Sequence, residues 1–150
     1  MNPEMSGWSG ASRLILYHSQ STSARTLFLR HATGSVIAPE PLPASSRLMG
    51  QQGREADISP LFLHPASVVG HYCASCGLAA SLLQADGEFH EQVATSGATL
   101  HVYLARFTSI DPPREWSAEQ GGKFSAITEL RGGSPVEMAL LQRAYQTIMG

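Results

Sequence analysis

The pattern of hydrophobic and polar positions divides the chain into strand-like and helix-like stretches. Residues 13–19 and 25–31 are short runs of bulky apolar residues on either side of the turn QSTSA, and they predict two strands joined as a hairpin. A second hairpin is predicted over residues 88–109, with its turn at Ser96 and Gly97. Its second strand is apolar on both faces, which is typical of a strand at the centre of a sheet.

The stretch HPASVVGHYCASCG, residues 64–77, predicts a helix. Pro65 suits the first helical position, and Gly77 suits the residue just past the helix end. Gly70 weakens this prediction, because glycine in a helix interior is unfavourable.

Residues 134–149 predict a C-terminal helix. Ser134 suits the N-cap, Pro135 suits the first helical position, and Glu137 stands three residues after the cap, where it predicts a capping box. One apolar stripe runs along the helix at helical spacing. Its members are Val136, Leu140, Leu141, Ala144, Tyr145 and Ile148.

The order of these elements is typical of an α+β protein. With a further strand predicted over residues 123–130, we expect one domain with an antiparallel or mixed sheet of about five strands and two main helices packed on it.

The Gly/Ser-rich residues 1–11 predict a mobile tail. Residues 38–59 hold three prolines and two glycines without a sustained period. They predict a long loop, and such loops often carry function.

The charge of the chain excludes one class of partner. The formal net charge is −2 and Lys123 is the only lysine, so the basic excess of a nucleic-acid-binding protein is missing. Residues 1–54 hold five arginines and two glutamates, a local charge of +3, and the remaining residues carry −5. This asymmetry indicates two halves of complementary charge that pack together, or else an anionic partner for the N-terminal part.

The compartment follows from what the chain lacks. It has no apolar run of roughly 18 residues that would predict a membrane span, and no signal peptide is recognisable at its start. With only two cysteines, we expect a protein of the reducing cytoplasm.

Cys73 and Cys76 form a Cys-x-x-Cys pair, a spacing that can carry redox chemistry or half of a zinc site. A reactive thiolate needs the positive end of a helix, whereas these cysteines lie near the C-terminal end of the predicted helix. They share its apolar face with Val68, Val69 and Tyr72. We therefore expect both thiols to fill core space and keep thiol-redox chemistry as an alternative.

A zinc site would need two more ligands beside Cys73 and Cys76. His71 and His90 are the candidates, but no second close pair of ligands stands at a standard spacing. We expect no metal and no other cofactor, with the Cys/His metal site as an alternative.

His101 is a candidate general base, because it shares a strand face with Tyr103 and Phe107 and is expected to border an apolar layer. Alternation along the neighbouring strand places Glu88 and His90 on one face. Glu91 follows on the other face. Two carboxylates and an imidazole could catalyse hydrolysis, although strands at the edge of a sheet often carry such polarity for solubility.

The turn Arg131-Gly132-Gly133-Ser134, before the C-terminal helix, is a candidate anion-binding site. Backbone N–H groups at a helix start and an arginine fork together suit a phosphate or a carboxylate. Glycine is also required in such turns for geometry alone, so the same pattern is explained without a ligand.

These features favour a small binding or accessory protein without catalysis, which acts through the loop of residues 38–59 and other exposed loops. A protein partner or a homo-oligomer is expected, with a small-molecule ligand possible and neither nucleic acid nor membrane as partner. The alternative is an enzyme or an anion or small-molecule binder, with a site at His101, Glu88, His90 and the Arg131-Gly132-Gly133 turn. The predicted contact residues of the binding protein are Trp8, Arg47, Leu48, Met49 and Trp116.

Overall fold

A computed structural model describes residues 12–20, 25–48, 64–130 and 133–149, and within them seven strands form one sheet. The strands are β1 (Ser12–Gln20), β2 (Arg25–Arg30), β3 (Ile37–Ala38), β4 (Arg47–Leu48), β5 (Leu83–Ala94), β6 (Thr99–Phe107) and β7 (Lys123–Ser125). Their order across the sheet is β4-β5-β6-β1-β2-β7, and β3 also pairs with β1. The α+β class is confirmed, but the prediction of about five strands was wrong. The two additional strands, β3 and β4, have two residues each.

Both predicted hairpins are present. β1 pairs with β2, and β5 pairs with β6, each in antiparallel orientation. The two hairpins join through β1 and β6, which run parallel. This parallel pair makes the sheet mixed, and it places β6 at the centre, as its two apolar faces predicted.

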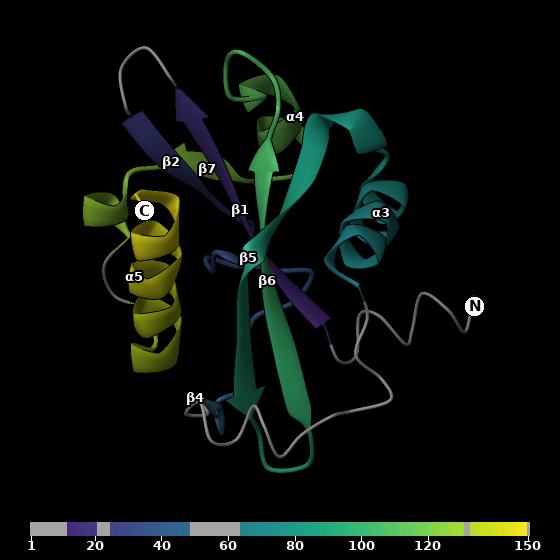
Figure 1. The fold of residues 1–150 in the computed structure, drawn as a ribbon. Helices are drawn as coiled ribbons and strands as arrows, with labels where there is room; N and C mark the ends of the chain where they lie inside the picture. Colours follow the sequence, from purple (N-terminus) through teal and green to yellow (C-terminus); the bar gives the residue numbers. More distant parts are fainter. Residues whose placement is uncertain (1–11, 21–24, 49–63, 131–132, 150) are drawn as a thin grey trace.

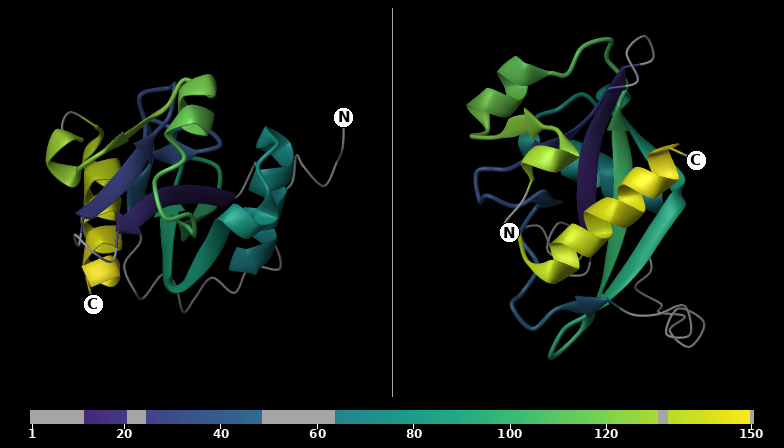
Figure 2. Two further views of the ribbon diagram at one scale, coloured as in Figure 1. Left: turned by 90° about the horizontal axis from the view of Figure 1, so that it is seen from above. Right: turned by 90° about the vertical axis from the view of Figure 1, so that its left-hand side faces the viewer.

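Helices cover both faces of the sheet (Figures 1 and 2). Helix α3 (Pro65–Cys76) and the short helix α4 (Arg114–Glu119) lie on one side, and α5 (Pro135–Met149) lies on the other. Two short 3₁₀ turns, η1 (Ala80–Leu82) and η2 (Ile127–Glu129), precede β5 and α5. The two main helices were predicted, and α4 is an additional short helix.

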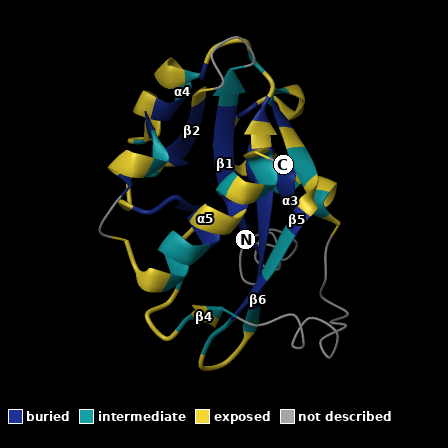
Figure 3. Ribbon diagram, turned by 60° about the vertical axis from the view of Figure 1, so that its left-hand side comes forward, coloured by how far each residue is buried: buried dark blue, intermediate teal, exposed yellow. Residues whose placement is uncertain are grey.

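The sheet separates two hydrophobic clusters. The cluster on the α3 side includes Leu14, Leu16, Val69, Cys73, Tyr103 and Phe107. The cluster on the α5 side includes Ile15, Phe28, Phe89, Val93, Leu140 and Leu141. Figure 3 shows the result, with buried central strands between helices whose outer faces are exposed. Because β1 contributes to both clusters, it is buried on both faces over most of its length.

The predicted helix ends are confirmed by their local geometry. Gly77 ends α3 in the left-handed conformation with a φ of 69°, and its N–H bonds to the carbonyl of Cys73. The Ser134 hydroxyl accepts a hydrogen bond from the N–H of Glu137 at 3.2 Å, which caps α5. In a complete capping box the Glu137 carboxylate would accept from the backbone N–H of Ser134. Here it accepts instead from the N–H of Val36 at 2.7 Å.

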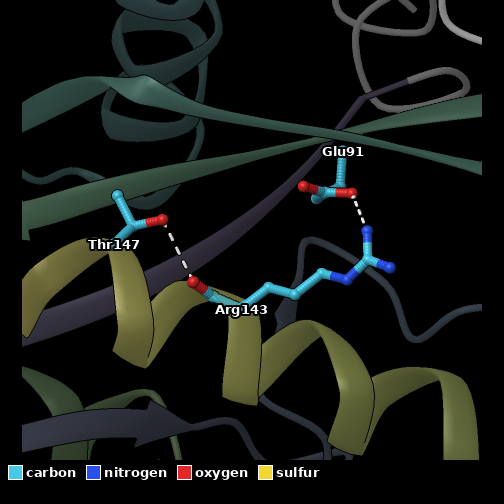
Figure 4. A network of polar contacts seen from close by, with 3 residues as sticks. All are labelled: Glu91, Arg143 and Thr147. Atoms are coloured by element: carbon cyan, nitrogen blue, oxygen red, sulfur yellow. Dashed lines mark hydrogen bonds and ion pairs between the residues drawn. The ribbon is translucent and has the colours of Figure 1, made fainter. Parts of the chain in front are cut away.

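An ion pair also joins helix α5 to strand β5. Arg143 of α5 donates a hydrogen bond of 2.6 Å to the carboxylate of Glu91 in β5 (Figure 4). The Thr147 hydroxyl donates to the carbonyl of Arg143 at 3.0 Å, within the helix. The ion pair is partly exposed, so its contribution to stability is about 0.5 kcal/mol, and the burial of the apolar stripe holds the helix in place.

A bulge interrupts the ladder between β5 and β6. The register shifts between Asp86 and His90, so that Asp86 pairs with Leu104 and His90 pairs with Tyr103. Three residues of β5 therefore lie opposite a single step of β6. The alternation of side chains is reversed across the bulge, because inserted residues change which face the following side chains occupy.

Candidate functional site

The outer edge of β5 is largely without a paired strand among the described residues. Its 12 residues pair with β6 on one side, whereas β4 pairs on the other side only with Val93 and Ala94. In the described part of the chain, no strand pairs with the outer edge from Leu83 to Gln92. The right-hand view of Figure 2 shows β5 at the margin of the sheet. Such an edge presents N–H and C=O groups to an incoming strand.

A groove of about 260 Å³ lies between α3 and the start of β5. Its walls are formed by small or apolar residues for the most part, and Gln84 adds one polar side chain. The lining residues are Ala66, Val69, Gly70, Ala80, Leu83, Gln84 and Ala85. A Cβ atom built on Gly70 has no neighbour within 4 Å, so this glycine leaves the helix wall open. The groove follows the open edge of β5 on the α3 face.

A second hollow, of about 230 Å³, lies on the α5 face of the same edge. It is polar, with two carboxylates, one guanidinium and one phenol among its lining groups. The lining residues are Tyr17, Gln84, Ala85, Asp86, Gly87, Glu88 and Arg106. Two carboxylates face one arginine, so the hollow carries a net negative charge. The two hollows share Gln84 and Ala85.

Two polar contacts organise the second hollow. The Tyr17 hydroxyl donates to Asp86 at 3.4 Å, and Arg106 donates to the side-chain oxygen of Gln84 at 3.2 Å. Burial raises the pKa of Tyr17 to about 12, and the negative charge of Asp86 contributes to the same shift. The phenol is therefore neutral at physiological pH and acts as a hydrogen-bond donor.

The predicted histidines form a second polar group, on the α3 side of the sheet. Nε2 of His90 lies 2.9 Å from Nδ1 of His101, so one imidazole donates a hydrogen bond to the other. The rings of His90 and Tyr103 are parallel within 7°, with centroids 5.1 Å apart. His101 is buried, as its strand face predicted. This hydrogen bond already engages one ring nitrogen of each histidine, namely Nε2 of His90 and Nδ1 of His101.

Glu88 does not join this pair, and the expectation that it shares a face with His90 was wrong. The bulge reverses the alternation between Asp86 and His90, and Glu88 lines the polar hollow on the α5 face. Glu88 thus lines the polar hollow with Asp86, whereas the two imidazoles lie beside Tyr103 on the α3 side. The predicted catalytic group of His101, Glu88 and His90 is not assembled.

The predicted anion turn is described only from Gly133 onward, since Arg131 and Gly132 lie outside the described residues. Ser134 uses its hydroxyl to cap α5. A Cβ atom built on Gly133 would lie 3.6 Å from the carboxylate of Glu137. The start of the helix therefore already holds a negative charge, and this opposes the binding of an anion.

Both cysteines lie in the last turn of α3. Cys73 is 1% exposed and belongs to the α3-side cluster, and Cys76 packs against that cluster. Burial raises the pKa of each thiol, as expected for thiols that fill core space. The helix exposes His71 in part, but within the described residues no group of three or more His, Cys, Asp or Glu side chains could hold a metal ion.

The residues predicted to contact a partner differ in their surroundings, and two of them are not described. Trp8 and Met49 lie outside the described residues, as do residues 49–59 of the predicted loop and the whole predicted tail. Arg47 is exposed in β4, and Leu48 packs against the α5-side cluster. Trp116 is half-buried and packs against Phe107, with ring centroids 5.9 Å apart, so it contributes mainly to the core.

Comparison with models of protein families and with curated proteins finds no match for this chain. Among the described residues, no helix has the length and apolar character needed to cross a lipid bilayer.

Sequence reasoning did not identify the open edge of β5 or the groove beside it. One local signal was present, because an isolated glycine within a strand indicates a bulge, and Gly87 lies in the bulge of β5. No local signal could have revealed that β4 pairs with only the last two residues of β5.

Proposed function

We propose that this protein is a small cytoplasmic binding or accessory protein that contacts another protein and catalyses no reaction of its own. The observation that supports this proposal is the open outer edge of β5, flanked on each face by a hollow. An exposed sheet edge is a template for pairing with a second chain, and main-chain hydrogen bonds supply affinity in that mode of recognition.

The loop after β6 extends the same surface. Thr108 donates its N–H to the carbonyl of Leu82 at 2.9 Å, which holds the loop beside the start of β5. His18, which is buried, bonds through Nε2 to the carbonyl of Ser109 at 2.8 Å. Between these anchors and the following prolines, Ile110 is 90% exposed. An apolar side chain held out on a fixed loop can contact a partner at little entropic cost.

The cytoplasmic part of the proposal is supported by the two free thiols, Cys73 and Cys76. They stand one helical turn apart and remain unpaired, as is usual in a reducing compartment.

Site-specific photocrosslinking in cells that express the full chain tests the binding function. A photoreactive side chain at Gln84, on the open edge, is compared with the same side chain at Gln142, which is exposed on α5. We expect a discrete protein adduct at Gln84 only. The adduct should disappear when Ala85→Pro is added, because proline removes the backbone N–H of an edge residue.

The absence of an adduct at Gln84, or the same adducts at both positions, would contradict the proposal. The fold of the Ala85→Pro variant is checked by circular dichroism and urea unfolding. A loss of the adduct counts only if the unfolding transition is retained.

A further inference from the structure

We infer that the partner of the β5 edge is an extended peptide segment in which apolar and basic side chains alternate, and that it pairs with Leu83–Asp86. This inference rests on the proposed function and specifies the chemistry of its partner. It follows from the direction of the backbone groups, from the two hollows and from their charge.

The backbone groups of alternate residues point outward along this stretch. Leu82 accepts a hydrogen bond from the N–H of Thr108, so this pair bonds toward β6. In an antiparallel ladder alternate residues bond to the same neighbour, so Gln84 and Asp86 also bond toward β6. Leu83 and Ala85 therefore turn their N–H and C=O groups outward, where a peptide can bond to them.

The two hollows match the alternation of an added strand. Side chains directly opposite each other in a ladder lie on the same face of the sheet. A peptide residue opposite Ala85 therefore points toward the groove beside α3, whose walls are mostly apolar. The residues opposite Gln84 and Asp86 point toward the polar hollow on the other face. Successive peptide side chains thus meet an apolar wall and a polar wall in turn.

The charge of the polar hollow favours basic side chains. Asp86 and Glu88 contribute two carboxylates, and Arg106 is the only cation among the lining residues. Arg106 already donates to Gln84. A lysine or arginine on the peptide restores the balance of charge, whereas an acidic residue increases the repulsion.

The length of the paired segment is limited at both ends. The 3₁₀ turn of Ala80–Leu82 precedes the edge, and the bulge after Asp86 ends the regular ladder. Regular pairing is therefore restricted to about four residues, and side chains in the hollows supply the specificity. The bulge also keeps the rest of β5 from pairing with an unrelated strand.

Capped synthetic peptides provide the test, with binding to the full chain measured by fluorescence anisotropy. The probe alternates valine and lysine over its length. One control alternates valine and glutamate, and a second has the composition of the probe with all valines together. We expect the probe to bind at least tenfold more tightly than either control, a difference of about 1.4 kcal/mol.

Two matched variants of Gly70 locate the binding site. Gly70→Leu fills the groove, because the Cβ position of Gly70 faces open space. It should weaken binding of the probe at least tenfold, whereas Gly70→Ala, which adds only a methyl group, should change it less than threefold. Both substitutions favour the helix, so neither should unfold the protein. Glu88→Gln should reduce the preference for lysine over glutamate by about threefold.

The outcomes separate this inference from the proposed function. If none of the three peptides binds while the photocrosslinked adduct at Gln84 persists, the inferred peptide chemistry is wrong and the binding function stands. If the adduct is also missing, both fail. Binding of the probe that is unchanged in Gly70→Leu would overturn the placement in the groove. Light scattering could also show a homodimer that Ala85→Pro converts to a monomer. A second copy of the chain would then be the partner of the β5 edge, and the inference of a peptide from another protein would be wrong.

Discussion

Glu137 in the first turn of α5 accepts a hydrogen bond of 2.7 Å from the backbone N–H of Val36, which lies 101 residues earlier in the chain. The same carboxylate oxygen accepts from the hydroxyl of Ser35 at 3.0 Å. Val36 and Ser35 are both buried. One side chain thus ties the start of the last helix to the segment that leads into β3.

Replacement of Glu137 by alanine should lower the free energy of unfolding by about 2–3 kcal/mol, because the buried N–H of Val36 loses its partner. Glu137→Gln keeps an acceptor oxygen and should cost about 1 kcal/mol. Ser134→Ala, which removes only the helix cap, should also cost about 1 kcal/mol. Urea unfolding measures all three, and equal losses for Glu137→Ala and Ser134→Ala would contradict this ranking.

His31 should make the stability of the protein depend on pH. Burial lowers the pKa of His31 from 6.5 to about 4, so the folded protein keeps the ring neutral. Between these values the unfolded chain binds a proton that the folded chain does not, and stability falls as the pH falls. From pH 7 to pH 4.5 the loss due to this residue is about 2 kcal/mol.

The matched variant is His31→Gln, which cannot titrate. Its unfolding free energy should fall about 2 kcal/mol less over the same pH range, measured by urea unfolding at a series of pH values. Parallel pH profiles for the two proteins would show that His31 is not the responsible group.

Two glycines should respond to alanine with opposite sign. Gly70 lies in α3 with open space around its Cβ position, so Gly70→Ala should raise the unfolding free energy by about 0.5–1 kcal/mol. Gly121 has a φ of +79°, and a Cβ atom there would lie 2.9 Å from the Cβ of Ala32. Gly121→Ala should therefore lower stability by about 1–2 kcal/mol. Thermal unfolding of both variants checks the pair, and a destabilised Gly70→Ala would argue against a regular helix at that position.

The cysteines should be slow to react in the native protein, because burial raises the pKa of both thiols. A chromogenic disulfide reagent at neutral pH should label them fully only after denaturation. Cys76 donates to the carbonyl of Tyr72 at 3.2 Å, a bond that a serine hydroxyl can replace. Cys73→Ser should therefore cost about 1–2 kcal/mol more than Cys76→Ser. Rapid labelling of Cys73 in the folded protein would indicate a functional thiol.

Structural features that depend only on residues close together in the chain could be predicted from the sequence. The caps at Ser134 and Gly77, the apolar stripes of both main helices and the turn at Ser96 and Gly97 are each determined within a few residues. Their structural outcome follows from backbone geometry and local hydrogen bonding, so the sequence alone determined these elements. The central place of β6 followed from its two apolar faces in the same way.

The contacts between segments that lie far apart in the chain could not be predicted from local patterns. The parallel pairing of β1 with β6, the short strands β3 and β4, and the Glu137–Val36 bond join residues that no local pattern relates. The bulge in β5 placed Glu88 and His90 on opposite faces of the sheet, which separated the predicted catalytic residues. It also limited the open edge to a short regular stretch beside the groove of α3. Strand pairing depends on the packing of the whole sheet against its helices, and periodicity within one strand does not encode which neighbour it receives.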